Sequence, residues 1–136
     1  MATSVRSYPM PDDILTAILE LARREKGADR LAFRGHDDEL QSVFAELSKD
    51  PKRSLLRLFV FSDSGPRPYS PTLNDSVSKL QLAGFLGRQN PDYEVVFTTT
   101  AARDYYETVL SNIFSDDEKN QLSEIAKVFL SHIRSV

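Results

Sequence analysis

The chain has 136 residues, of which 40% are hydrophobic and 27% charged, and this composition excludes disorder throughout and suits one domain with a core of its own. It contains no cysteine, which excludes disulfides, thiol catalysis and zinc sites built on thiolates. The net charge of −3 comes from the second half, because residues 1–69 hold 11 Lys/Arg against 11 Asp/Glu and residues 70–136 hold 6 against 9.

The first residues, MATSVRSYPMP, contain no apolar run of the kind that a signal peptide needs. Nowhere do about 18 apolar residues follow one another, as a membrane span requires. We therefore expect a cytoplasmic protein without membrane contact, in which residues 1–11 form an N-terminal tail.

Two helices are predicted in the first third of the chain. The first starts with Asp12 or Asp13 as its cap and ends near Gly27, with Ile14, Ile18, Leu21 and Ala22 at helical spacing. The second opens at Asp37 and Asp38 and is closed by Pro51 after Asp50. Its apolar face is predicted to be core and consists of Leu40, Val43, Phe44 and Leu47.

The segment Ser54–Ser62 is short and almost continuously apolar, so that a buried strand and the end of a helix look alike there; we favour a strand. The connection SDSGPRPYS then leads to Ser70, whose hydroxyl can cap a helix that has Pro71 as its first residue. That helix should bury Leu73, Val77 and Leu80 and end at Gly84 in a left-handed conformation. Two short strands follow, Phe85–Gln89 and Tyr93–Thr98, on either side of the turn Asn90-Pro91-Asp92.

The last third of the chain is predicted to be helical. Thr99 or Thr100 caps one helix, and Ser115 and Glu118 form the capping box of another. The stripe of this last helix consists of Leu122, Ile125, Ala126, Phe129 and Ile133. We expect it to pack on its own domain; the alternative is a two-fold dimer interface formed by the C-terminal helix.

The order loop, helix, strand, turn, strand between Ser62 and Thr100 is that of the back half of a winged helix. The predicted fold class is therefore α+β and mostly helical, with a winged helix-turn-helix core over residues 12–98. Residues 99–136 are predicted to be a helical extension of the same domain.

Three segments resemble Panacea-type and related uncharacterised bacterial winged-helix domains. They are Gly35–Phe44 (GHDDELQSVF), Phe61–Pro71 (FSDSGPRPYSP) and Leu80–Leu86 (LQLAGFL), and the resemblance spans residues 12–110. In those domains a leucine-glutamine helix precedes an aromatic segment, and a Gly-Pro-Tyr-Ser loop enters the next helix; here Arg67 and Pro68 stand between Gly65-Pro66 and Tyr69-Ser70. Because roles in that family include toxin neutralisation and regulation, the resemblance implies an interaction protein more than an enzyme.

If the fold is a winged helix, the side chains that would read DNA lie on the helix after Pro71 and at the wing. They are Thr72, Asn74, Ser78, Lys79, Gln81, Arg88 and Gln89. Only Lys79 and Arg88 are cationic, whereas Asp75, Asp92 and Glu94 would repel phosphate. A separate basic group, Lys49, Lys52, Arg53 and Arg57, could contact the backbone from another face, although we favour solvated charges around a turn.

A protein-interaction module is the competing prediction. The loop around Arg67 and Tyr69 offers a rigid, aromatic and cationic projection of the kind that anchors binding partners. For Tyr69 itself we favour the alternative in which it folds back onto Leu73 and belongs to the core. Tyr105 and Tyr106 are adjacent on a helix, so that they cannot both face the core.

No residue pattern commits the chain to a reaction. His36-Asp37-Asp38 has no partner at ligand spacing, and its acidic residues suit the start of a helix. There is no nucleophile-elbow frame and no phosphate-binding glycine loop. We therefore predict a non-enzymatic regulatory protein without cofactor or metal that binds DNA, or alternatively an antitoxin-like or scaffolding interaction module that does not.

Overall fold

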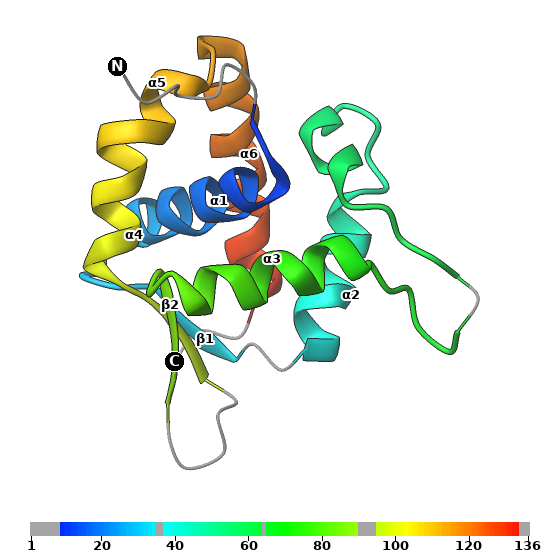
Figure 1. The fold of residues 1–136 in the computed structure, drawn as a ribbon. Helices are drawn as coiled ribbons and strands as arrows, with labels where there is room; N and C mark the ends of the chain where they lie inside the picture. The colour runs from blue at the N-terminus through cyan, green and yellow to red at the C-terminus, as the bar shows by residue number, and fades with distance from the viewer. Residues whose placement is uncertain (1–8, 35–36, 64, 90–94, 134–136) are drawn as a thin grey trace, which may run out of the picture.

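The computed structural model describes residues 9–34, 37–63, 65–89 and 95–133. This part of the chain is mostly helical and carries one small antiparallel sheet (Figure 1). Its elements in chain order are α1 (Pro11–Lys26), β1 (Ala32–Arg34), α2 (Asp37–Leu47), the 3-10 helix η1 (Ser54–Leu58), α3 (Pro71–Leu82), β2 (Leu86–Gln89), β3 (Val95–Thr98), α4 (Thr100–Tyr105), the π-helical segment η2 (Tyr106–Leu110), α5 (Ser111–Ile113) and α6 (Asp116–His132).

Helix ends that depend on local chemistry lie where the sequence predicts them. Ser70 Oγ accepts a hydrogen bond from Leu73 N with Pro71 at the first helical position, and Thr99 caps α4. Ser115 and Glu118 form the predicted capping box of α6. The chain leaves α1 at Gly27 and turns after α3 at Gly84, both with positive φ.

Three boundaries were predicted wrongly. Ser54–Leu58 is a 3-10 helix and not part of a strand, and Phe59 continues it as extended chain. The second helix ends at Leu47, before Pro51, because residues 48–52 already form turns. The first helix begins at Pro11, and the Asp13 carboxylate serves its start by accepting a hydrogen bond from Met10 N at 2.9 Å.

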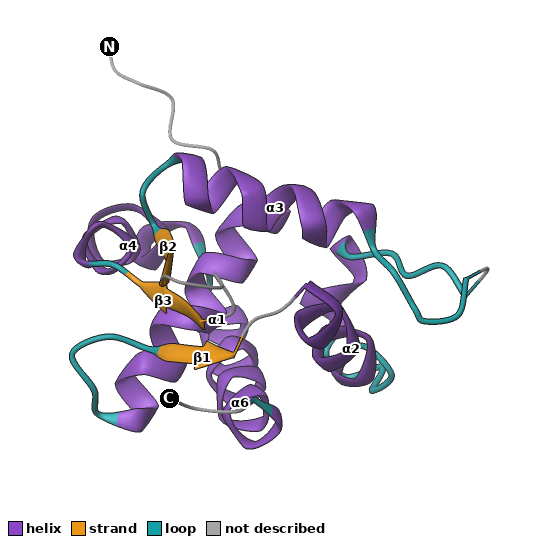
Figure 2. Ribbon diagram, turned by 90° about the horizontal axis from the view of Figure 1, so that it is seen from below, coloured by secondary structure: helices purple, strands orange, loops and turns teal. Residues whose placement is uncertain are grey.

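The sheet has the order β1-β3-β2, and both pairs are antiparallel (Figure 2). The two strands predicted around the turn are confirmed as β2 and β3, while the turn Asn90-Pro91-Asp92 and the start of the second predicted strand lie outside the described residues. The strand β1 was not predicted. It places Ala32 opposite Phe97 and Arg34 opposite Val95.

The core surrounds α1, which packs against α6, α3 and η2. The predicted stripe of α6 is confirmed: Leu122, Ile125, Ala126 and Phe129 are buried in this domain, so that face is covered within the chain rather than left for a second copy. Four phenylalanine rings join β1, α6, α2 and the segment after η1. They contact edge to face, with centroids 5.7 Å apart from Phe33 to Phe129, from Phe129 to Phe44 and from Phe44 to Phe59.

Residues 48–70, here called the α2–α3 connection, leave the body of the molecule and return to it. Leu56 and Phe59 are buried in the core, and Gln121 Oε1 on α6 accepts a hydrogen bond from Leu55 N at 2.7 Å. Figures 1 and 2 show that the connection reaches away from the end of α3 that is remote from the sheet. The connection and the sheet hairpin therefore lie at opposite ends of α3.

Candidate functional site

The predicted DNA-contacting residues come together only in part. Ser78, Lys79 and Gln81 are exposed on α3, whereas Thr72 and Asn74 are half-buried near its start. Arg88 on β2 donates from Nε to Gln81 Oε1 at 3.3 Å, which joins the helix to the sheet. Gln89 ends β2, and its side chain lies outside the described residues.

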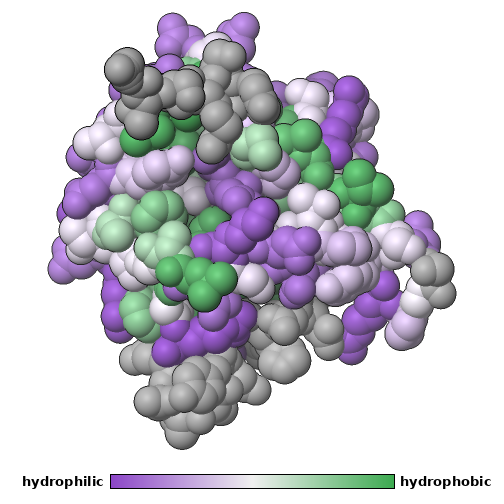
Figure 3. All heavy atoms as spheres, in the orientation of Figure 1, coloured by the Kyte–Doolittle hydropathy of each residue, from purple (hydrophilic) through white to green (hydrophobic). Residues whose placement is uncertain are grey.

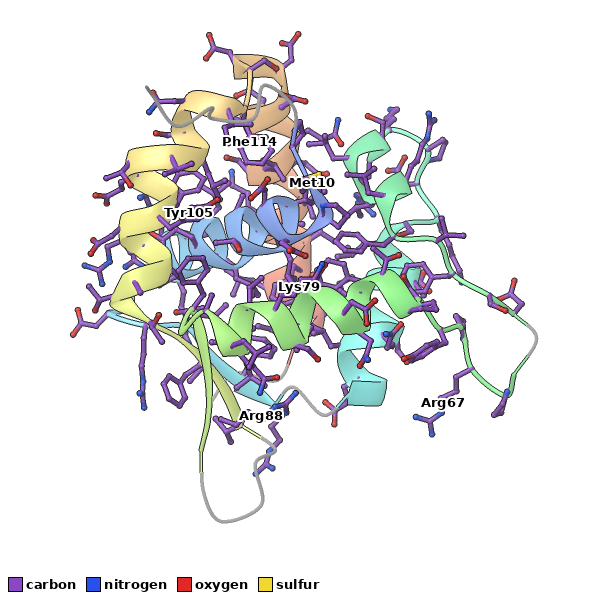
Figure 4. All side chains as sticks on the ribbon, in the orientation of Figure 1. Met10, Arg67, Lys79, Arg88, Tyr105 and Phe114 are labelled. Atoms are coloured by element: carbon purple, nitrogen blue, oxygen red, sulfur yellow. The ribbon has the colours of Figure 1, made fainter. Side chains whose placement is uncertain are left out.

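Lys79, the only cation on α3, faces an acidic group. Its Nζ lies 3.9 Å from Asp12 Oδ2, and Ser76 Oγ donates to the other oxygen of that carboxylate at 2.7 Å. Figure 4 shows Lys79 between α3 and the start of α1, and Arg88 apart from it at the sheet. Since Asp75 is also exposed on α3, the outer side of this helix carries no excess of positive charge.

Apolar surface interrupts the same side of α3. The side chain of Leu82 at the end of the helix is 89% exposed, the highest value among the exposed large hydrophobic residues. A DNA-reading helix meets phosphates and polar base edges with most of its exposed side chains. A single exposed leucine is common on protein surfaces, so Leu82 by itself favours neither DNA nor a protein partner.

The outer half of the α2–α3 connection is a hairpin held to α2 by one side chain. Ser62 N donates to Tyr69 O at 2.8 Å, and Tyr69 N donates to Ser62 O at 3.1 Å. The buried side chain of Gln41 then pairs with both backbone groups of Ser70: Oε1 accepts from Ser70 N at 2.8 Å, and Nε2 donates to Ser70 O at 2.9 Å. The Gln41 amide thus pairs with the backbone of the residue that follows the Ser62–Tyr69 bridge, and so links the hairpin to α2.

The connection exposes several apolar side chains. Val60 is 70% exposed, Tyr69 45% and Leu58 41%. This exposure of Tyr69 contradicts the alternative in which it folds into the core. Figure 3 shows hydrophobic side chains over part of the connection, and further hydrophobic groups on the opposite side of the same face, among hydrophilic ones.

Two concavities flank the hairpin. The larger, of about 560 Å3, is lined by the predicted partner-binding residues Arg67 and Tyr69 together with Gln41, Ser62, Gly65, Pro66 and Pro68. Figure 4 places Arg67 on the projecting part of the connection. The smaller, of about 300 Å3, is here called the η1 groove; its lining residues are Ala45, Ser48, Lys49, Leu56, Arg57, Phe59, Phe61, Asp63 and Pro68.

Of the four basic residues predicted around the turn, two make contacts within the chain, and two pair with no carboxylate among the described residues. Arg53 donates to Leu47 O at 3.0 Å and to Glu124 at 3.4 Å, so it ties the connection to α6. Lys49 contacts Glu46 at 3.1 Å. In the described part of the chain, the side chains of Lys52 and Arg57 are exposed and pair with no carboxylate.

A third concavity, of about 310 Å3, lies between the start of α1, α3 and α4. Tyr105 closes one side of it, with its ring 5.0 Å from that of Phe85 and its hydroxyl 3.4 Å from Asp13 Oδ1. Tyr106, its neighbour, is buried under the guanidinium of Arg24, as expected of two adjacent tyrosines on a helix. The carboxylates here take part in helix start and packing contacts.

Among the described residues, no group of three or more His, Asp or Glu side chains could hold a metal ion; His36 lies outside them. Of the helices that the structure describes, none has the length and apolar character needed to cross a membrane.

Sequence reasoning missed the residues that build the connection. Gln41 was read only as part of a motif, and Val60 and Leu58 only as members of an apolar segment. The pattern buried-exposed-half-buried over Phe59, Val60 and Phe61 is visible once the chain is known to be extended there. In the sequence all three residues are apolar, so no alternation is visible there, and only the fold shows which of them is exposed.

Comparison with known proteins adds no relative: no protein-family model, no curated protein and no solved structure matches the chain.

Proposed function

We propose that this chain is a non-enzymatic protein-interaction module of winged-helix type, and that it binds its partner through the α2–α3 connection rather than reading DNA with α3. The observation that carries the proposal is the contrast between two surfaces. α3 carries one cation, Lys79, together with the exposed Asp75 and the nearby Asp12. The connection instead exposes Val60, Tyr69 and Leu58 beside cations that pair with no carboxylate in the described part of the chain.

The order of elements supports the winged-helix part of the proposal. Helix, strand, two helices and a hairpin follow one another as α1, β1, α2, α3, β2 and β3, and the first strand pairs with the last. A DNA-reading helix-turn-helix joins its two helices by a turn of about three or four residues. Here residues 48–70 separate them, which supports a use of this fold other than groove reading.

Electrostatics supports the choice of a protein partner over DNA. Binding to a duplex at physiological salt depends on several phosphate contacts from Lys and Arg. The described outer side of α3 offers Lys79, which lies against Asp12, and the exposed Asp75 opposes phosphate. DNA binding therefore stays the second hypothesis, favoured by the element order alone.

The test pairs a DNA titration with capture of a partner. Anisotropy of fluorescent random-sequence duplex, titrated from about 20 to 200 mM salt, should show no binding by the full chain even at the lowest salt. The immobilised chain should retain a protein from native lysate that a Val60→Asp, Tyr69→Ser double variant does not retain. Salt-sensitive DNA binding that Lys79→Glu removes, together with no difference in capture, would reject the proposal.

A further inference from the structure

We propose that the segment bound by this module is acidic and apolar, with one Leu or aromatic side chain entering the η1 groove and flanking carboxylates meeting Arg57 and Lys49. This inference rests on the proposed function, because it names the chemistry of the partner at the same connection. Three properties of the groove support the inference: its shape, its rigidity and its charge.

The floor of the η1 groove is apolar and preformed. Leu56 and Phe59 are buried, with the Phe59 ring edge to face on Phe44 at 5.7 Å, and Phe61 packs partly buried against the same core. Ala45 of α2 forms the opposite wall. A volume of about 300 Å3 stands at the lower end of ligand pockets, so it suits one anchoring side chain of a larger partner.

The elements around the groove are held in place without a ligand. Gln121 of α6 accepts from Leu55 N at 2.7 Å, and Arg53 bonds to Leu47 O at 3.0 Å. These contacts fix η1 between α2 and α6. A groove that is ordered before binding loses less entropy when a partner docks, which favours recognition of a short segment.

Charge complementarity identifies the flanks of the partner segment. Residues 48–70 carry five Lys/Arg against two Asp, whereas the rest of the chain carries 12 Lys/Arg against 18 Asp/Glu. Arg57 lines the groove, is exposed and has no carboxylate partner in the described part of the chain. Lys49, which also lines the groove, pairs with the exposed Glu46 in the described part of the chain, and such surface pairs are weak enough for a partner carboxylate to compete.

Asp63 is the exception on the groove lining. It is exposed at the hairpin end, next to Pro68 and away from η1 in the chain. The carboxylates of the partner should therefore gather at the side of the groove formed by Arg57 and Lys49. An apolar residue should face Pro68.

The inference is tested by selecting short random peptides on the immobilised full-length chain. The enriched peptides should share a Leu or aromatic residue flanked by Asp or Glu. A synthetic peptide of the enriched sequence should then bind the Arg57→Glu variant about five- to twentyfold more weakly in fluorescence anisotropy, since a favourable pair becomes a repulsion. Lys127→Glu makes the same charge change on the exposed side of α6 and should leave affinity unchanged.

Two further variants separate shape from charge. Ala45→Phe fills the groove from α2 and should abolish peptide binding. Circular dichroism shows whether the Ala45→Phe variant folds. If this variant does not fold, the Arg57→Glu variant still tests the inference. Exchanging the Asp and Glu of the peptide for Lys should restore binding to Arg57→Glu while weakening it for the native chain. Such a reciprocal exchange places the peptide carboxylates beside Arg57.

Other results overturn the inference. Enriched peptides without acidic residues, peptides indifferent to Arg57→Glu, or a library without any enrichment all exclude an acidic segment in the η1 groove. The proposed function is judged separately, because partner capture that depends on Val60 and Tyr69 would survive each of these results. Loss of both readouts would remove the proposed function as well.

Discussion

At the scale of single residues, Gln41 does the most to shape the candidate surface. Its amide satisfies the backbone N–H and C=O of Ser70, which are buried and 29 residues away in the chain. No local sequence pattern predicts this contact, because a glutamine on a helix is ordinarily exposed. The role of Gln41 as a backbone partner could not be derived without the position of Ser70.

We predict that Gln41→Ala destabilises the fold by about 1–3 kcal/mol, because it leaves the buried Ser70 N–H without a partner, while Ser70 O still accepts from Asn74 N at 3.2 Å. Chemical denaturation measures this loss, and hydrogen exchange at the Ser70 amide should accelerate more than exchange in α6. Ser42→Ala changes an exposed neighbour on the same helix and should have little effect. Equal protection of Ser70 in the Gln41 variant and the native chain would contradict the account.

A second residue-scale prediction concerns pH. The carboxylate of Glu20 is buried and accepts hydrogen bonds from Arg23 at 2.7 and 3.0 Å and from Arg24 at 2.8 Å. Burial alone would raise the pKa of Glu20, but the two guanidinium groups outweigh it and hold that pKa below the ordinary 4.5. Ionised Glu20 therefore stabilises the fold above about pH 4.5, and this contribution is lost as the pH falls through the folded-state pKa.

The Glu20→Gln variant should accordingly be about 2 kcal/mol less stable than the native chain at neutral pH. Its free energy of unfolding should fall less steeply between pH 5 and the acid transition, since one linked proton is removed. Urea denaturation at a series of pH values measures both effects. Parallel pH profiles for the two chains would contradict the assignment.

At the scale of elements, the sequence predicted what neighbouring residues determine. Caps at Ser70, Thr99 and Ser115 follow from side chains that reach their own helix within three residues. The strand β1 could not be found in this way, because three residues become a strand only by pairing with Val95–Phe97. The 3-10 helix η1 could not be predicted either, because the burial of Leu56 and the hydrogen bond that Leu55 N donates to Gln121 Oε1 favour it.

The hairpin of the sheet depends on a close approach that only glycine permits. A Cβ at Gly87 would lie 2.4 Å from Phe97 Cζ, the outer end of a half-buried ring that also carries the Arg30 guanidinium, whose carbon is 4.4 Å from the ring centroid. The ring therefore has to move if residue 87 gains a side chain. Glycine at this position belongs to the packing of the sheet rather than to a turn.

We predict that Gly87→Ala costs about 0.5–1.5 kcal/mol of stability, because the half-buried Phe97 ring has to leave its preferred rotamer. Thermal and urea unfolding measure the change. Gly65→Ala is the matched control, because its nearest atom would be Arg67 O at an ordinary 3.8 Å; it should change stability by less than about 0.5 kcal/mol. A Gly87 variant as stable as the Gly65 variant would mean that the Phe97 ring is not confined.

At the scale of the whole molecule, charge is separated between the connection and the rest of the chain. The cationic part projects from one end of α3, and the remainder is acidic, so an acidic partner is attracted only where the connection presents its apolar residues. Charge counts over the two halves of the sequence do not show this separation, because acidic residues earlier in the first half balance the cations of residues 48–70. The folded arrangement reveals it by setting residues 48–70 apart.

The positive electrostatic potential of the connection should mainly change the association rate constant of an acidic peptide. The association rate constant of the selected peptide should fall with rising salt, and Arg57→Glu should flatten that dependence. Stopped-flow fluorescence with labelled peptide measures the rate directly. A rate that is insensitive to salt in the native chain would assign binding to apolar contact alone.

An amide chemical-shift map of the 15N-labelled full chain, recorded with the selected peptide and with random duplex DNA, distinguishes the two binding surfaces. We expect the peptide to shift amides of Ala45–Leu47 and of the connection, and the duplex to shift none. Shifts confined to Thr72–Leu82 and Leu86–Gln89 on addition of duplex would contradict this expectation and would make α3 the reading helix of a DNA-binding protein.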